Sequence, residues 1–187
     1  MAKVDQLAAT FRDHVAVGWP SGSSGAQRVI MIVYDPNDER TLRKNIDLFA
    51  QAARAHDYAW YALDLTSLFG TWLGAHRYRE GYIEEPHMLF AGANERFTQY
   101  AADAVLKVLE RSGHTDREIV GLIGVGSLFG AASVSDILTR VDHAIKGRLA
   151  VFFPGRARDG RYRLLDGRDG WDYHAVPIQI DNSGTHQ

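Results

Sequence analysis

The most informative part of the chain is an apolar run that leads into a helix start, Arg28-Val29-Ile30-Met31-Ile32-Val33-Tyr34-Asp35-Pro36-Asn37-Asp38. A continuous apolar run of this length is typical of a strand buried on both faces, as in a parallel sheet covered by helices. Asp35 can cap the free amides of a helix, and Pro36 needs no hydrogen-bond donor in the first turn. The pattern predicts a buried strand over residues 28–34 with a helix directly after it.

The same alternation of strand and helix patterns continues on both sides of this segment. Apolar residues at helical spacing predict four helices. They cover residues 2–17, the segment from the Asp35 cap to about residue 56, residues 94–112, and the segment from Ser133 or Ser135 to Gly147. Further strands are predicted at residues 58–65, 119–125 and 148–153, with a hairpin or a pair of edge strands at 161–165 and 173–180. Residues 66–94 carry no clear periodicity, although Leu68, Phe69, Trp72 and Leu73 can form a short helix.

Strands that alternate with helices predict an α/β fold with a mainly parallel sheet and helices on both faces. We expect a degenerate nucleotide-binding-like fold without a P-loop, and an antiparallel edge near the C-terminus. The 187 residues fit a single domain. Its expected parts are an N-terminal helix with a Gly/Ser linker (1–27), a core (28–180) and a tail (181–187).

The composition excludes several classes of protein. With 45% hydrophobic residues the chain is not mainly disordered, and a net charge of −2 gives no global sign of nucleic-acid binding. The absence of cysteine excludes disulfides and thiol catalysis. No signal-peptide pattern is visible, and the longest uncharged stretch, residues 119–135, is too short and too rich in glycine to span a bilayer. We expect a cytoplasmic protein without a membrane segment.

Several polar or glycine-rich turns follow the predicted strands directly. They contain Asp35, Asp64, Gly124, Gly126 and the Pro154-Gly155 pair. In a parallel sheet these turns lie along the carboxyl edge, where open α/β folds bind ligands. Asp35 and Asp64 can form a carboxylate pair there, or each can cap the helix that follows it.

The turn from Gly124 to Gly130 has two interpretations. Gly124, Gly126 and Gly130 can let backbone amides approach a dinucleotide, or they can serve tight strand-to-helix packing. No P-loop, nucleophile elbow or clustered metal-ligand pattern occurs in the sequence. We therefore expect no enzymatic activity, and the sequence names no cofactor and no metal ligand.

A basic segment lies near the C-terminus. Between residues 148 and 168 stand Arg148, Arg156, Arg158, Arg161, Arg163 and Arg168. Asp159 and Asp166 stand among them, so the segment keeps an excess of positive charge. The loop from Arg156 to Arg168 can contact DNA phosphates, or it can be an ion-paired edge that faces solvent.

The tail carries a distinctive pattern, Phe152-Phe153-Pro154-Gly155 followed by Tyr162-Arg163-Leu164-Leu165-Asp166-Gly167-Arg168-Asp169-Gly170-Trp171-Asp172-Tyr173-His174-Ala175-Val176-Pro177-Ile178. This pattern resembles the end of the BrxB family, a small component of BREX phage-defence systems. Asp35-Pro36-Asn37-Asp38 with the Leu42–Ile46 helix, and the segment from Gly124 to Gly130, are similar to earlier parts of that family. The resemblance extends from about Arg28 to the end of the pattern.

The resemblance implies an accessory protein without established catalytic residues. Its expected partners are other BREX components: an alkaline-phosphatase-like protein, a DNA methyltransferase or an ATPase. Tyr, Trp and Arg are enriched at protein interfaces. The candidate interface residues are Pro154, Gly155, Arg156, Arg158, Tyr162, Arg163, Trp171 and Tyr173. Alternatively, Tyr162, Trp171 and Tyr173 close the sheet edge and cover the core.

Overall fold

The structure is a computed structural model of the chain. It describes residues 3–19, 22–90, 93–111, 113, 115–165 and 171–180. The predicted tail, residues 181–187, lies outside the described residues, as does Arg168. At residues 171 and 172 the description covers the backbone alone.

Five strands form a parallel sheet at the centre of the molecule. They are β1 (Val29–Tyr34), β2 (Ala59–Asp64), β3 (Glu118–Ile123), β4 (Arg148–Arg158) and β7 (Val176–Ile178). Their order is β2-β3-β4-β1-β7, and each neighbouring pair runs parallel. All residues of β1 and β3 are buried, as expected of strands covered on both faces. The predicted α/β fold with a mainly parallel sheet is confirmed.

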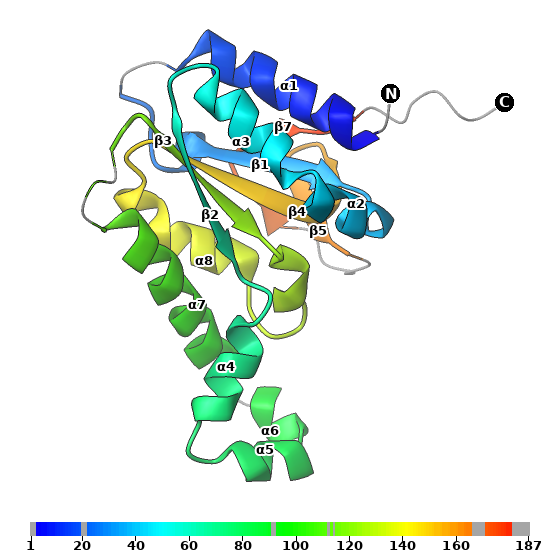
Figure 1. Cartoon of the computed structure of the whole chain (residues 1–187). Helices are drawn as coiled ribbons and strands as arrows, with labels where there is room; N and C mark the ends of the chain where they lie inside the picture. The colour runs from blue at the N-terminus through cyan, green and yellow to red at the C-terminus, as the bar shows by residue number, and fades with distance from the viewer. Residues whose placement is uncertain are drawn as a thin grey trace, which may run out of the picture.

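Helices cover both faces of the sheet (Figure 1). On one face lie α1 (Lys3–Val17), α2 (Glu39–Lys44) and α3 (Ile46–Arg54), and on the other lie α7 (Ala93–Leu109) and α8 (Val134–Val141). The sheet divides the core into two clusters. Phe11, Phe49 and Phe152 centre the first, whereas Phe97, Leu138 and Phe153 belong to the second. Successive residues of β4 therefore enter opposite clusters, as the alternation of a strand requires.

Short 3₁₀ segments connect these elements, namely η1 (Ala26–Arg28), η2 (Pro36–Asp38), η3 (Val125–Leu128) and η4 (Asp142–Ala144). The helix predicted to extend to about residue 56 is divided at Asn45. There the side-chain amide donates to the Thr41 carbonyl at 2.8 Å, and the backbone amide donates to Leu42. Such local bonds compete with regular helix, which explains the break.

The C-terminal part differs from the prediction in two strands, the fourth and the last. β4 continues beyond residue 153 to Arg158, and its end pairs antiparallel with β5 (Arg161–Leu164). β5 pairs in turn with β6 (Trp171–Asp172). This extension supplies the predicted antiparallel edge. β7 instead returns to the main sheet and pairs parallel with β1.

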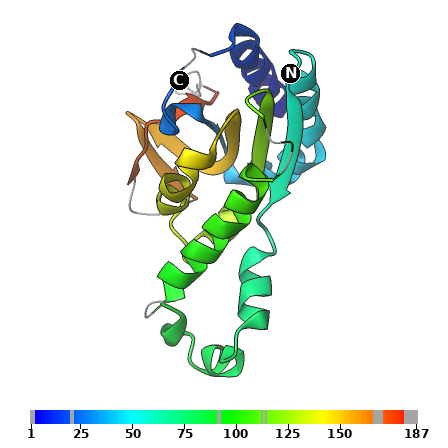
Figure 2. The same cartoon turned by 90° about the vertical axis from the view of Figure 1, so that its left-hand side faces the viewer.

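Residues 66–90 form a helical arm, of which the sequence indicated only a short helix that begins near Leu68. It contains α4 (Leu68–Ala75), α5 (Arg79–Glu84) and α6 (His87–Phe90), and it projects away from the sheet (Figure 2). Phe69 and Trp72 anchor the arm against Phe97 of α7, at ring distances of 5.1 and 5.4 Å. Within the described part of the chain, no helix has the length and apolar character needed to cross a bilayer.

We expect Phe49→Ala to lower the free energy of unfolding by about 3–5 kcal/mol, because the ring is fully buried between Phe11 and Phe152. The matched control is Phe129→Ala, since the Phe129 side chain is 50% exposed, and its effect should stay within about 0.5 kcal/mol. Urea unfolding of both variants measures the difference. Equal losses would contradict this description of the core.

Candidate functional site

The carboxyl edge of the sheet brings together most of the turns singled out by the sequence. The strand order places the turns after β2, β3 and β1 on this edge, with Pro154 of β4 opposite Tyr34. A hollow of about 330 Å³ opens there. Its lining residues are Pro36, Glu39, Arg43, Thr66, Gly124, Gly126, Ser127, Pro154 and Leu165. The sequence had predicted the edge and its glycines but had not singled out Arg43.

Arg43 is the centre of a polar network in this hollow. Its guanidinium donates to Glu39 at 2.7 Å, to Asp64 at 2.9 Å and to the Thr66 hydroxyl at 2.6 Å. The Tyr34 hydroxyl donates to the other Glu39 oxygen. The only sequence signal for this network is the i,i+4 spacing of Glu39 and Arg43. The contact with Asp64 joins α2 to the end of β2 and depends on the tertiary fold.

The network and partial burial shift the pKa values of three of its groups, Asp64 downward and Arg43 and Tyr34 upward. Partial burial by itself would raise the pKa of the Asp64 carboxyl, but hydrogen bonds from Thr66 and Arg43 hold that pKa below its usual range. Burial also opposes the charge of Arg43, yet its bonds to Asp64 and Glu39 raise its pKa. Burial and the neighbouring Glu39 raise the pKa of Tyr34. Two carboxyl groups, of Glu39 and Asp64, face the one guanidinium of Arg43, and this arrangement disfavours a bound phosphate in this hollow.

Asp35 and Asp64 have separate roles at this edge. The Asp35 carboxylate accepts from the Asn37 amide at 2.9 Å and caps the turn after β1, whereas Asp64 accepts from the Thr66 amide at 2.9 Å. β3 and β4 lie between their strands, which corresponds to a separation of about 14 Å. The geometry thus supports the capping interpretation for Asp35. Asp64 instead pairs with Arg43 and accepts from Thr66, and it does not cap α4, so neither a second helix cap nor a carboxylate pair is formed.

The glycines at the end of β3 serve close packing. Gly124 has φ +74°, and a Cβ there would lie 2.3 Å from the Thr66 hydroxyl oxygen and 2.7 Å from a nitrogen of Arg43. A Cβ on Gly126 would lie 3.1 Å from the Pro154 ring. These contacts come from the chain's own residues, so they support the packing interpretation of this turn over the dinucleotide one.

The extension of β4 carries the basic residues. Asp159 and Gly160 both have positive φ, at 52° and 77°, and form the tip of the β4–β5 hairpin. An Asp-Gly pair between alternating residues is a strong hairpin signal, and it could have identified this turn from the sequence. The register places Arg156 opposite Arg163 and Arg158 opposite Arg161.

The four arginines of the hairpin lie on one face, because directly opposite and alternate residues share a side of a ribbon. All four are exposed, whereas Tyr162 on the other face is 1% exposed and packs against Phe153. Arg158 is 3.7 Å from the Asp159 carboxylate at the tip. We call Arg156, Arg158, Arg161 and Arg163 the arginine face.

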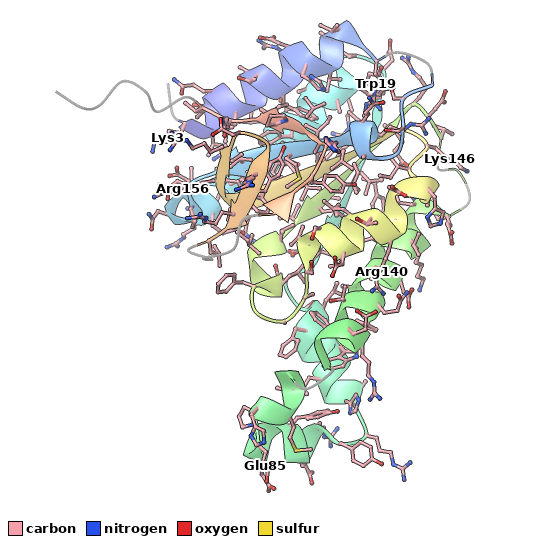
Figure 3. All side chains as sticks on the ribbon, turned by 180° about the vertical axis from the view of Figure 1, so that it is seen from behind. Lys3, Trp19, Glu85, Arg140, Lys146 and Arg156 are labelled. Carbon is pink, nitrogen blue, oxygen red and sulfur yellow. The ribbon has the colours of Figure 1, made fainter. Side chains whose placement is uncertain are left out.

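A second hollow, of about 570 Å³, opens at the root of the hairpin. Arg156 and Arg158 line it from one side, and Lys3 of α1 lines it together with Asp38. Lys3 and Asp38 are 4.0 Å apart. Figure 3 shows Lys3 and Arg156 on the same side of the molecule. The hollow is thus lined by three cationic side chains, Lys3, Arg156 and Arg158, and by two carboxylates, Asp35 and Asp38.

The other candidate interface residues contribute to packing. Pro154 and Gly155 are buried at the root of the hairpin, where a Cβ on Gly155 would lie 2.1 Å from the Arg163 carbonyl oxygen. Tyr162 and Tyr173 adjoin the core, and burial raises the pKa of Tyr173 to about 12. The Trp171 side chain is outside the description. Of the predicted interface residues, the arginines Arg156, Arg158 and Arg163 are therefore the ones whose side chains are exposed to a partner.

Neither the side chains nor known proteins assign a chemistry to these hollows. Among the described residues, no group of three or more His, Asp or Glu side chains is placed to hold a metal ion. No family model, no curated protein and no solved structure matches the chain. The function is therefore inferred from the geometry and the charge of this surface.

Two glycine variants test the packing role of Gly124. Gly124 and Gly130 have nearly the same φ, at +74° and +75°, but a Cβ on Gly130 would meet nothing within 4 Å. Gly130→Ala should lose about 1 kcal/mol of stability from backbone strain alone. Gly124→Ala should lose about 2 kcal/mol more, because it displaces Arg43 and Thr66. Equal losses in thermal or urea unfolding would contradict the packing role.

The Asp64 network predicts a pH dependence of stability. The folded pKa of Asp64 lies below the unfolded value of about 3.9, so its contribution is fully present above that pH and is lost as pH falls through the folded pKa. Asp64→Asn should therefore destabilise the chain at neutral pH, with a difference that shrinks in acid. Urea unfolding over a pH series measures it, and a pH-independent difference would refute the role of the charge.

Proposed function

We propose that this chain is a non-enzymatic adaptor of a BREX-type antiviral system, which docks another component through the arginine face. The sequence resemblance to the BrxB family motivates the choice of system. The docking surface is argued from the hairpin itself. The favoured partner is an acidic surface on the alkaline-phosphatase-like protein, the DNA methyltransferase or the ATPase of the system.

The observation that carries this proposal is the pairing of like charges. Arg156 stands directly opposite Arg163, and Arg158 directly opposite Arg161. Like charges in opposite positions of a ribbon destabilise it. Acidic residues offset this toward the tip, where Asp159 lies 3.7 Å from Arg158 and Asp172 of β6 stands opposite Arg161. An acidic partner would neutralise both pairs at once, and arginine forms bidentate bonds with carboxylates.

Direct DNA contact is the second candidate, and the same arginine face favours it. Arginine binds phosphate in the same bidentate manner, and a two-stranded ribbon fits the major groove of DNA. The net charge of −2 makes the chain as a whole a poor polyanion binder, so we place this function second. The two candidates differ in partner and in the salt dependence of binding.

The test is the double variant Arg156→Gln, Arg163→Gln, which removes one like-charged pair. Its free energy of unfolding should be unchanged or higher by a few tenths of a kcal/mol, because a repulsion between like charges is removed. It should at the same time lose the stoichiometric partner that the parent chain retains from cells expressing the neighbouring genes. Affinity capture with mass spectrometry, repeated with each purified component, measures the loss.

Arg96→Gln is the matched control, since Arg96 is an exposed arginine on α7, away from the hairpin. It should retain the partner. If the double variant still retains the partner, the arginine face is not the docking surface. If the parent instead binds duplex DNA with an affinity that falls steeply with salt and fails in the double variant, DNA contact replaces the adaptor proposal.

A further inference from the structure

The outermost strand of the sheet, β2, is exposed in a way that its neighbours are not. None of the six residues of β2 is buried, whereas all six of β3 are. Tyr61 is 40% exposed, although it stands in the middle of the strand. Strands of parallel sheets are ordinarily buried on both faces. β2 therefore leaves its outer edge and part of each face accessible, while Trp60 and Leu63 are half-buried against the two core clusters.

The two edges of the sheet differ in protection. At the opposite edge β7 has three residues and contains Pro177, features that discourage strand pairing. β2 is twice as long, and its segment Ala59–Leu63 contains no charge and no proline. Long uncharged edges of this kind pair readily with other strands. Among the described residues, β2 pairs only with β3.

Hydrogen bonds at the two ends of β2 show which of its backbone N–H and C=O groups face β3 and which face the open edge. The amides of Ala59 and Leu65 donate to carbonyls of Arg117 and Ile123 on the β3 side, each at 2.9 Å. Because successive residues of a strand direct their backbone groups to alternate sides, Trp60, Ala62 and Asp64 present theirs to the open edge. These groups can accept another strand.

We propose that β2 pairs antiparallel with β2 of a second copy of this chain, about a two-fold axis through Tyr61. A two-fold axis perpendicular to the sheet makes the two β2 strands antiparallel. It also places the same face of both sheets on the same side of the dimer. The residue numbers of each opposite pair then add up to 122, so Trp60 of one copy lies opposite Ala62 of the other. The outward N–H and C=O groups of these two residues form hydrogen bonds with each other. The two parallel sheets become one continuous sheet with a C2 interface.

Side-chain size supports this pairing. The larger Leu63 stands opposite the small Ala59 of the second copy. Trp60, whose ring packs against Phe11 and Phe152 of its own chain, stands opposite the small Ala62, which leaves that ring undisturbed. At the axis Tyr61 meets Tyr61 of the second copy, and aromatic cross-strand pairs stabilise antiparallel ribbons. A strand whose large residues fall opposite its own small residues is complementary to itself. This favours a second copy over the strand of an unrelated protein.

Charge supports the same register. Asp64, which is paired with Arg43 of its own chain, comes opposite Tyr58 of the second copy. The Tyr58 ring carries the Arg117 guanidinium at 4.7 Å, so a second cation approaches this carboxylate. Arg111 stacks over Tyr61 at 4.3 Å and is paired with Glu118, which balances its charge near the axis. An axis through Ala62 would instead place Asp64 against the ring of Trp60. The axis through Tyr61 is therefore the favoured one.

Cysteine crosslinking tests the register, because the chain has no cysteine of its own. Residues at a non-hydrogen-bonded antiparallel pair have Cα atoms about 4.5 Å apart, within disulfide reach. Tyr61→Cys should therefore oxidise to a covalent dimer. Ala62→Cys is the matched control, since its two Cα atoms would be about 9 Å apart, beyond disulfide reach. Preferential crosslinking at Ala62, or none at Tyr61, would overturn the proposal.

Analytical ultracentrifugation of the unmodified chain gives an independent measurement. At tens of micromolar it should sediment as a dimer, and Ala62→Pro should sediment as a monomer, because the Ala62 amide points outward and not to β3. The circular dichroism spectrum of Ala62→Pro should match the parent. If the unmodified chain is monomeric at this concentration, the proposal is overturned, and the open edge is then assigned to the strand of a partner protein.

Discussion

The parallel pairing of β1 with β4 is the constraint on which the rest of the structure depends. Six residue pairs, from Val29 with Leu149 to Tyr34 with Pro154, lie buried between the two helical layers. β1 ends at Tyr34, whereas β4 continues. The continuation leaves the main sheet at its carboxyl edge and forms the hairpin with β5. The position of the arginine face is thus a consequence of a difference in length between two central strands.

The sequence predicted the elements that are local and periodic, and missed those that depend on contacts between distant residues. The apolar run before Asp35 and the Asp35 cap correspond closely to the structure, because both depend on neighbouring residues. The bonds from Arg43 to Asp64 and Thr66 join residues more than twenty positions apart, and no spacing announces them. The arginine pairs depend on register, which a hairpin fixes only once its tip at Asp159 is identified.

The same distinction explains the outcome for the glycine turn after β3. Glycine spacing alone is compatible with a bound pyrophosphate or with tight packing. The surroundings decide between them, because the space that a Cβ on Gly124 would need is already filled by Thr66 and Arg43. Arg43 in turn directs its guanidinium to Glu39 and Asp64. A side chain held by two carboxylates braces the junction of α2 and β2 and offers little to a phosphate.

The arginine face and the β2 edge lie on different parts of the sheet and do not compete. β3 lies between β2 and β4, and the hairpin extends beyond the main sheet from the carboxyl end of β4. Antiparallel pairing of two β2 strands directs the carboxyl edges of the two copies in opposite directions. Each arginine face then stays open in the dimer. An acidic partner with two or more sites would bind such a dimer by avidity, without any increase in the strength of the individual contact.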